Sequence, residues 1–267
     1  MSGDPAALPE DVTVDALSGP WRIHQRRRGH RWSIDDLITA HVACAARPLA
    51  TTHLDLGCGI GSVLMLCAYR FRARPVSHVG VEAQAQSLVL CRASLALNGI
   101  AGRVQVRESD FRVDTAFPPG ERFALVTGTP PYIPVGTGVA PRDAQKAGAR
   151  MELRGGVEAY ALTAAAHLEV GGVVVVCGDG RRPERTEAAA RAAGLWVTSW
   201  LELIPHLDKG PLFHVVTMEP AQPSAVPRER LLARERDGRR SLAVQRIRAA
   251  FDMPPMAGDD PSLGVGR

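Results

Sequence analysis

From residue 51 onward, short apolar runs typical of buried strands alternate with segments that have the apolar spacing of helices. Residues 173–177 are uniformly apolar, which predicts a strand with both faces buried. The expected strands are residues 52–56, 77–81, 104–108, 123–127, 173–177, 195–204 and 213–219, and the helices between them are residues 62–69, 83–97, 156–168 and 183–193. This alternation predicts an α/β fold, in which a mostly parallel central sheet carries helices on both faces.

The chain on either side of this region has a different character. Residues 1–20 are expected to form a loose leader, and Ser33 is placed to cap a helix over residues 34–47. A short helix is expected at residues 241–251. We therefore divide the chain into an N-terminal basic segment with its lead-in helix (residues 1–48), a main α/β domain (residues 49–220) and a C-terminal basic appendage with a frayed tail (residues 221–267).

Composition narrows the class of protein. The 267 residues are 45% hydrophobic and 22% charged, which excludes disorder of the whole chain. No apolar stretch approaches the roughly 20 residues of a membrane-spanning helix, so we expect no membrane association. The five cysteines include no Cys-X-X-Cys pair, so we expect no metal site, and their odd number favours the reducing cytoplasm.

The net charge of +4 is unevenly spread along the chain. Residues 22–31 hold five arginines and no acid, and residues 228–248 hold eight arginines against three acids. Two basic segments on an otherwise acidic chain predict a polyanionic partner, with Arg26, Arg27, Arg28 and the C-terminal Arg-rich segment as the contacts. A generally arginine-rich composition would give the same pattern without any polyanion.

The first candidate for chemistry is a glycine-rich loop after the first strand of the main domain. It places Gly57, Gly59 and Gly61 between that strand and a helix, as nucleotide-binding loops do. Ser62 stands where nicotinamide enzymes have their third glycine, so the pattern differs from theirs. Asp55 precedes the glycines, where it would repel a pyrophosphate but suits a cationic ligand.

The next two strands also end in acidic residues. Glu82 follows the second strand, where a carboxylate can accept hydrogen bonds from both hydroxyls of a ribose. Asp110 and Phe111 follow the third strand and could bind the amino group and flank the ring of an adenine. An acidic helix start and a solvent-facing turn are the structural alternatives.

The fourth strand leads into the sequence Thr129-Pro130-Pro131-Tyr132. The two prolines stiffen the backbone and leave carbonyl acceptors, and Tyr132 supplies a flat face for stacking. This loop suits a planar group that bears an amino group. Residues 133–155, rich in glycine and basic residues, are expected to form a substrate lid or a solvated loop.

These four loops together resemble those of class I S-adenosylmethionine-dependent methyltransferases. Within that class the chain is similar to the amino-methyltransferase group whose target loop reads Asn-Pro-Pro-Tyr. This group includes the tRNA adenine-N6 methyltransferase-like proteins and the HemK-type release-factor glutamine methyltransferases. The resemblance spans roughly residues 29–218, where residues 29–35 are similar to the lead-in of the tRNA branch and residues 151–158 to a stretch of the HemK-like proteins.

The resemblance implies a Rossmann-like fold with an antiparallel last strand and S-adenosyl-L-methionine as cofactor. It assigns cofactor binding to Asp55, Gly57, Gly59, Gly61, Glu82, Asp110 and Phe111, and binding of the target amino group to Thr129, Pro130 and Tyr132. Thr129 replaces the Asn or Asp of the family motif, and its shorter hydroxyl can both accept and donate. The position therefore leaves the identity of the target open.

The function expected from these features is methylation of the exocyclic amino group of an adenine in RNA, as in tRNA modification. One alternative is methylation of a protein glutamine or of a small molecule. A second alternative is a non-catalytic RNA-binding protein that keeps the fold, because Thr129 departs from the catalytic motif.

Overall fold

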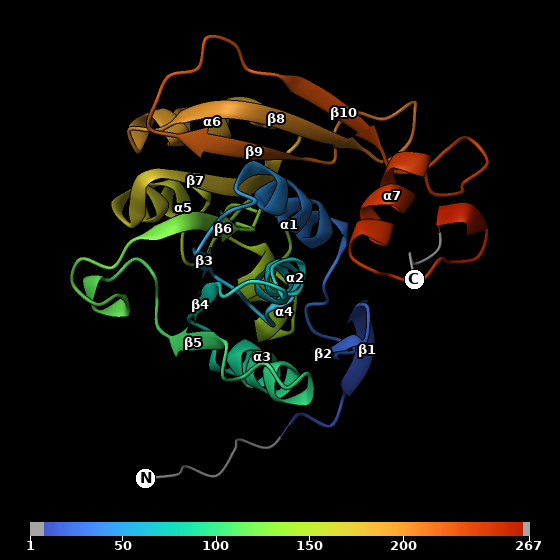
Figure 1. Ribbon diagram of the computed structural model, residues 1–267, viewed down its shortest axis with the longest axis horizontal. Helices are drawn as coiled ribbons and strands as arrows, with labels where there is room; N and C mark the ends of the chain where they lie inside the picture. The colour runs from blue at the N-terminus through green and yellow to red at the C-terminus, as the bar shows by residue number, and fades with distance from the viewer. Residues whose placement is uncertain (1–7, 264–267) are drawn as a thin grey trace.

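The computed structural model describes residues 8–263, and an eight-stranded sheet forms its centre (Figure 1). The order across the sheet is β10-β8-β9-β7-β6-β3-β4-β5, and β9 runs antiparallel to both of its neighbours, whereas the other pairs are parallel. These strands are β3 (Thr52–Leu56), β4 (Ser77–Glu82), β5 (Val104–Glu108), β6 (Phe123–Gly128), β7 (Leu168–Asp179), β8 (Trp196–Ile204), β9 (Phe213–Glu219) and β10 (Arg228–Leu232). The predicted Rossmann-like sheet and its antiparallel strand are confirmed.

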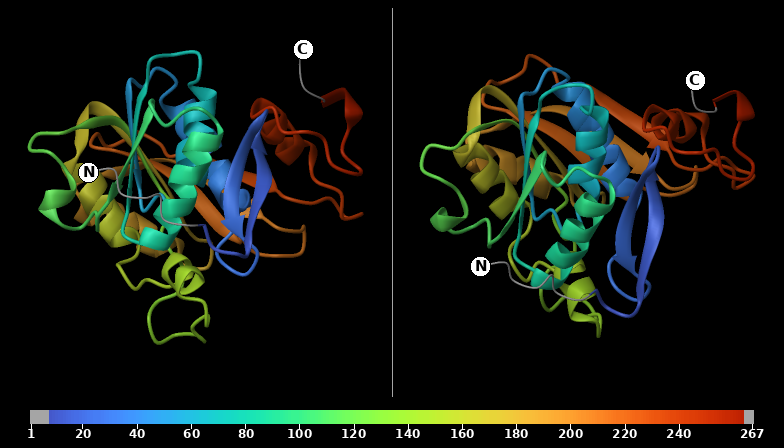
Figure 2. Two further views of the ribbon diagram at one scale, coloured as in Figure 1. Left: turned by 90° about the horizontal axis from the view of Figure 1, so that it is seen from below. Right: turned by 60° about the horizontal axis from the view of Figure 1, so that its bottom comes forward.

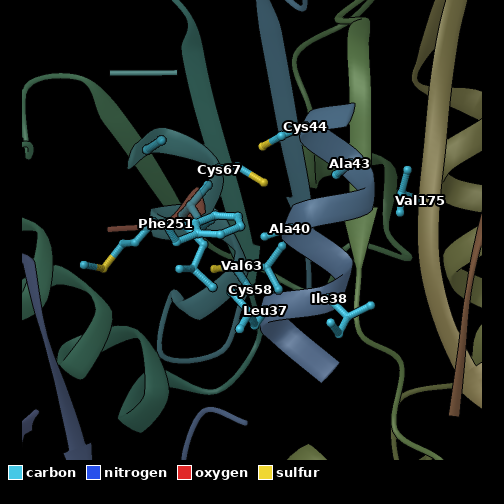
Figure 3. Packing of buried hydrophobic residues seen from close by; sticks show 14 of the residues in the cluster. Leu37, Ile38, Ala40, Ala43, Cys44, Cys58, Val63, Cys67, Val175 and Phe251 are labelled. Atoms are coloured by element: carbon cyan, nitrogen blue, oxygen red, sulfur yellow. The ribbon is translucent and has the colours of Figure 1, made fainter. Parts of the chain in front are cut away.

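Helices cover the sheet on both faces. On one face lie α1 (Ile34–Ala46), α2 (Ser62–Arg70), α3 (Ala85–Leu97) and α7 (Leu242–Ala250), and on the other α5 (Val157–Ala166) and α6 (Pro183–Ala192). Two hydrophobic clusters result, and β7 contributes to both: Val175 belongs to the first and Val174 to the second. The expectation that this strand is buried on both faces is therefore confirmed. Figure 3 shows how α1 packs in the first cluster, where Cys44 and Cys67 lie beside Ala40 and Phe251.

The N-terminal region is more ordered than the sequence analysis expected. In place of a loose leader over residues 1–20, strands β1 (Val12–Ser18) and β2 (Trp21–Arg26) form an antiparallel hairpin, while residues 1–7 lie outside the described part. The hairpin turns at Gly19, whose φ is 50°, and it packs against α3, where Ser94 Oγ accepts from the His24 amide at 2.8 Å (Figure 2). The alternation of apolar and polar residues from Val12 onward is the signal that was missed.

Three further segments differ from expectation. Strand β10 lies where no strand was expected, and it extends the sheet by pairing with β8. A helix, α4 (Ala144–Arg150), forms inside the expected lid, and α5 ends at Ala166, so that β7 begins before the glycines at residues 171–172. Two 3₁₀ turns, η1 (Asp114–Ala116) and η2 (Pro261–Leu263), complete the described elements. Over residues 8–263, the longest helices are too short and too polar to cross a bilayer.

Candidate active site

A narrow cavity of about 70 Å³ opens where β3, β4, β5 and β6 end. Each of these strands contributes the residues that immediately follow it, because parallel strands bring their carboxyl ends to one edge of the sheet. The cavity is lined on this side by Gly57, Cys58, Gly59, Ile60, Ser62, Glu82, Ala83, Asp110, Phe111 and Thr129. Most of the predicted site residues, from four separate loops, therefore meet at one place.

The glycine loop has the backbone that its sequence predicts. Gly57, Gly59 and Gly61 have φ values of 61°, 56° and 87°, which residues with side chains rarely adopt. A Cβ atom on Gly57 would lie 2.3 Å from the Tyr160 hydroxyl, so this position also lacks room for a side chain. A Cβ on Gly59 would meet no atom within 3.8 Å, so the loop is open to a ligand there.

Glu82 ties this loop to the neighbouring strand. Its carboxylate accepts from the Gly59 amide at 2.8 Å and from the Gln84 amide at 2.7 Å. The side chain is buried, and this burial raises the pKa of Glu82, while the two amides and Arg154 oppose the shift. Each carboxylate oxygen retains capacity for a further donor, so Glu82 can still accept from two ribose hydroxyls.

Asp110 and Phe111 line the same cavity beyond β5. Arg112 donates to both oxygens of Asp110, at 2.9 and 2.6 Å, and this pairing lowers the pKa of Asp110. Phe111 packs edge-on against Tyr160 with ring centroids 4.6 Å apart. The two residues thus offer a fixed carboxylate and an aromatic surface side by side.

Asp55 lies beneath the glycine loop and is not among the residues that line the cavity. Thr127 on β6 donates to its carboxylate at 2.7 Å, and burial raises the pKa of Asp55 to about 7. His53 Nε2 lies 2.8 Å from the same hydroxyl, and His53 Nδ1 lies 3.0 Å from His78 Nδ1. A buried polar chain therefore crosses three strands under the loop, and Asp55 supports the site from below.

The target loop divides between two cavities. Thr129 lines the cavity beside the glycine loop, Pro130 and Tyr132 line a smaller one of about 10 Å³ at the end of β7, and Pro131 lies between the two and lines both. The Tyr132 hydroxyl lies 2.8 Å from Cys177 Sγ. The structure therefore does not bring Tyr132 to the same cavity as Thr129, because the Tyr132 side chain turns toward Cys177 on β7.

Residues 133–155, the lid segment, lie over the cavity and extend from the body of the molecule (Figure 2). Asp143 caps α4 and pairs with Arg26 at 2.7 Å, and the buried Gln145 accepts from the His30 amide and donates to Ser87. Gly148, Ala149, Arg154 and Gly155 of this segment line the cavity.

The pairing of Arg26 departs from the expected role of that residue. Its guanidinium contacts Asp11 at 2.8 Å as well as Asp143, and its side chain is only 14% exposed. Arg26 thus holds the lid segment to the hairpin, because its position on β2 is inside the fold and not ahead of it. Arg27 and Arg28 are exposed, and neither side chain donates a hydrogen bond within residues 8–263.

Asp36 is a buried carboxylate at the cavity that the sequence analysis did not assign to the site. It is 4% exposed, accepts from the Ser33 amide at 2.9 Å and lines the cavity opposite the glycine loop. Burial first, and then the neighbouring Asp35, raise the pKa of Asp36 well above its usual value. Asp36, Ala40 and Ala43 are spaced so that they lie on one face of a helix, and both alanines are buried. This spacing could have indicated from the sequence that Asp36 faces inward.

The residues around the cavity fit the cofactor that the sequence implies. The open backbone at Gly59, the free acceptor capacity of Glu82 and the aromatic surface of Phe111 match a ribose and a base. The present volume is well below the roughly 300–1,000 Å³ of ligand pockets, and four residues of the lid segment contribute to the walls. Among the described residues, no cluster of side chains is suited to holding a metal ion.

Comparisons with known proteins agree with this geometry, although no protein-family model matches the chain. The tRNA1(Val) (adenine(37)-N6)-methyltransferases of two Vibrio cholerae strains are 27% identical over 207 residues, which covers 77% of this chain and 82% of each relative. The solved structure of a predicted O-methyltransferase from Agrobacterium tumefaciens superposes with a TM-score of 0.63 at 20% identity, over 84% of this chain and 100% of that one. A type I restriction-modification methyltransferase subunit from Streptococcus thermophilus gives a TM-score of 0.52 at 15% identity, over 73% of this chain and 45% of that one.

Enzymes of this class take their methyl group from S-adenosyl-L-methionine. The chain therefore shares the fold of solved methyltransferases, and over most of its length its sequence is similar to the tRNA adenine-N6 methyltransferases of Vibrio cholerae.

Proposed function

We propose that this enzyme methylates the exocyclic amino group of an adenine in tRNA. The observation that carries the proposal is the position of Thr129, which faces the glycine loop across a single cavity. The named activity of the Vibrio cholerae relatives supports the choice of an adenine in tRNA as the target. The expected cytoplasmic location agrees with such a substrate.

The cofactor side of the site is assigned to the first three strand ends. Glu82 accepts from the ribose hydroxyls, Gly57 and Gly59 let the backbone approach the ligand, and Asp110 and Phe111 bind the adenine of the cofactor. Gly61 and Asp55 hold the loop from beneath, Gly61 as the left-handed N-cap of α2. The lid segment moves away from the cavity to admit a ligand of this size.

The target side holds the amino group for reaction. The Thr129 hydroxyl and the Pro130 carbonyl accept its two hydrogens and leave the nitrogen lone pair directed at the methyl group. When bound, S-adenosyl-L-methionine supplies a methyl group on a cationic sulfur, which leaves as a neutral thioether. The protein contributes alignment of the nitrogen, carbon and sulfur atoms, exclusion of water and acceptors that favour the positive charge developing on nitrogen.

Tyr132 can stack on the target base only after its side chain changes position. Its hydroxyl is engaged with Cys177, and Arg182 donates to its backbone carbonyl at 2.7 Å. Stacking on the target base requires the side chain to leave Cys177 and turn toward Thr129. In the present arrangement Tyr132 fixes the course of the target loop.

The basic segments are assigned to the RNA. Arg27 and Arg28, which are exposed, and the C-terminal Arg-rich segment are proposed to contact phosphates, since such contacts need side chains that are free to reach them. Arg26 is left out of this assignment because two carboxylates hold it.

The test is methylation of unmodified tRNA transcripts with methyl-labelled cofactor, followed by nucleoside analysis. We expect label in N6-methyladenosine. Cell protein and metabolite fractions are treated in parallel, and label that appears only there would establish the glutamine or small-molecule alternative. Tight tRNA binding without label in any fraction would establish a non-catalytic RNA-binding protein.

A further inference from the structure

A second and larger cavity, of about 360 Å³, lies beyond the ends of β8 and β10. Because β8 and β10 run parallel to β7, this cavity opens at the same edge of the sheet as the active site. We call it the basic groove. It is lined by Trp32, Ser33, Ile34, Leu37, Leu203, Pro205, His206, Leu212, Ala233, Arg234, Arg240, Val244 and Arg248.

The start of α1 separates the basic groove from the active site. His30 and Asp36 line the active-site cavity, whereas Trp32, Ile34 and Leu37 line the groove. Residues that are only one or two positions apart therefore face different cavities. If an RNA strand places one base beside Thr129, the adjacent nucleotides can therefore cross the start of α1 and reach the groove.

The floor of the groove is apolar and carries aromatic side chains. Leu37, Leu203 and Val244 are buried beneath it, Trp32 is half-buried, and His206 is exposed at its rim. Flat aromatic and aliphatic surfaces of this kind stack unpaired bases with little dependence on sequence.

Three arginines face the groove, and no residue that lines it is acidic. Arg234 donates to the Gly238 carbonyl, and Arg248 donates to the Pro254 carbonyl, so neither has a carboxylate partner within residues 8–263. The Nε atom of Arg248 is buried without any partner. Arg240 pairs with Asp259 at 3.5 Å, and the excess of positive charge in the groove comes from Arg234 and Arg248.

Other arginines of the same segment are already neutralised. Arg228 contacts Glu187 at 2.6 Å and lies over the Trp200 ring, and Arg230 contacts Glu202 at 3.1 Å. The two arginines of β10 are therefore held by carboxylates, whereas Arg234 and Arg248 of the groove are not.

We propose that the basic groove binds an unpaired nucleotide of the RNA next to the one that is methylated. Its base stacks on Trp32 over the apolar floor, and Arg234, Arg240 and Arg248 contact its phosphates. This inference rests on the proposed RNA substrate and narrows the contacts from the whole C-terminal segment to three side chains.

The test compares two pairs of substitutions with equal changes of charge in the full chain. The Arg234→Gln, Arg248→Gln protein removes groove cations, and the Arg228→Gln, Arg230→Gln protein removes paired ones. With an unmodified tRNA transcript as probe, we expect the groove protein to bind about tenfold more weakly, with a salt slope lower by about 1–2. The control protein should bind nearly as the wild type does, and affinity for S-adenosylmethionine should be unchanged in both. Equal losses in the two proteins, or no loss in the groove protein, would overturn the proposal.

A second substitution avoids any risk to folding from Arg248. Leu212 lines the groove but is 53% exposed, so Leu212→Glu places a negative charge there without burying it, and Leu97→Glu on α3 is the matched control at 52% exposure. We expect weaker tRNA binding for Leu212→Glu alone. If the wild-type chain methylates tRNA and Leu212→Glu does so with unchanged kcat/KM, the groove proposal fails and the proposed function stands. If binding depends on the groove but adenine is never methylated, the groove proposal stands and the proposed function fails.

Discussion

The two halves of the active site are held in place by different kinds of contact. The glycine loop is fixed by its own strand neighbours, because the Gly59 amide donates to Glu82 and the Cys58 amide donates to the Val81 carbonyl. The lid segment is fixed by contacts with distant parts of the chain, namely the side chains of Arg26 and Ser87 and the backbone amide of His30. The cofactor side is therefore preformed with the sheet, whereas the target side can open while the sheet stays intact.

Replacing Glu82, which links the glycine loop to β4, tests the side of the site that is built with the sheet. Glu82→Ala loses the acceptors for the ribose and leaves the Gly59 and Gln84 amides unpaired. Hydrogen bonds to a charged group are worth about 1.5–3 kcal/mol each, so we expect cofactor affinity to fall between about tenfold and about a thousandfold by calorimetry. Glu108→Ala, an exposed carboxylate at the end of the next strand, is the control and should bind normally. Normal cofactor binding by a folded Glu82→Ala protein would refute the ribose assignment.

The target half is tested at Thr129. Thr129→Val keeps the shape but removes the acceptor, which should lower kcat by about 5- to 150-fold, equivalent to roughly 1–3 kcal/mol, while cofactor affinity is unchanged. Thr129→Asn restores the family motif and should keep or raise the activity on adenine. Thr137→Val, in the exposed part of the same segment, is the control. A fully active valine protein together with an inactive asparagine protein would show that Thr129 only fills space, and the adenine assignment would have to be withdrawn.

The buried chain beneath the glycine loop predicts a pH dependence of stability. Burial raises the pKa of Asp55 from 3.8 to about 7, so the folded state binds a proton that the unfolded state has already released. The contribution of Asp55 to the free energy of unfolding therefore falls as pH rises from about 4 to about 7, by about 1.4 kcal/mol per pH unit at most, and is constant above that range.

The contribution of His78 to the free energy of unfolding changes with pH in the opposite direction over much of this range. Its pKa is lowered from 6.5 to about 4 by burial, so its contribution rises with pH between those values. Asp55→Asn keeps an acceptor for Thr127 and removes only the titration. Urea unfolding should show that the asparagine protein gains stability relative to the wild type as pH rises from 4 to 7. A constant difference between the two proteins across this range would show that Asp55 does not titrate there.

The smallest effects are expected among the N-terminal arginines. Although these residues are neighbours in sequence, we expect Arg27 and Arg28 to affect tRNA binding and Arg26 to affect the stability of the lid segment. The Arg27→Gln, Arg28→Gln protein should bind tRNA with a salt slope lower by about 1–2 and an unchanged melting temperature. Arg26→Gln should instead speed limited proteolysis of the lid segment, because its contacts with Asp11 and Asp143 are lost. If Arg26→Gln behaved like the other two substitutions, the lid would not depend on that ion pair.

Local sequence was sufficient for much of the fold and for the cofactor side of the site. The strands at residues 52–56, 104–108 and 213–219 were predicted with the bounds that the structure has. Gly57, Gly59 and Glu82 also line one cavity, because the loops that carry them follow parallel strands that end at one edge. The hairpin was missed although its alternating pattern was visible, and β10 was missed because charged residues dominate its sequence.

The sequence by itself determined where the parallel strands end, and hence which loops gather around the cavity, because short-range patterns of apolar residues and glycines fix strands and tight turns. Only the tertiary structure decided that Tyr132 turns toward Cys177, that Arg26 holds Asp143, and that Asp36 faces the cavity. These outcomes depend on which partner lies within a few ångströms in the folded chain. Partners such as Arg26 and Asp143 are more than a hundred residues apart, and a pattern read over neighbouring positions carries no information about them.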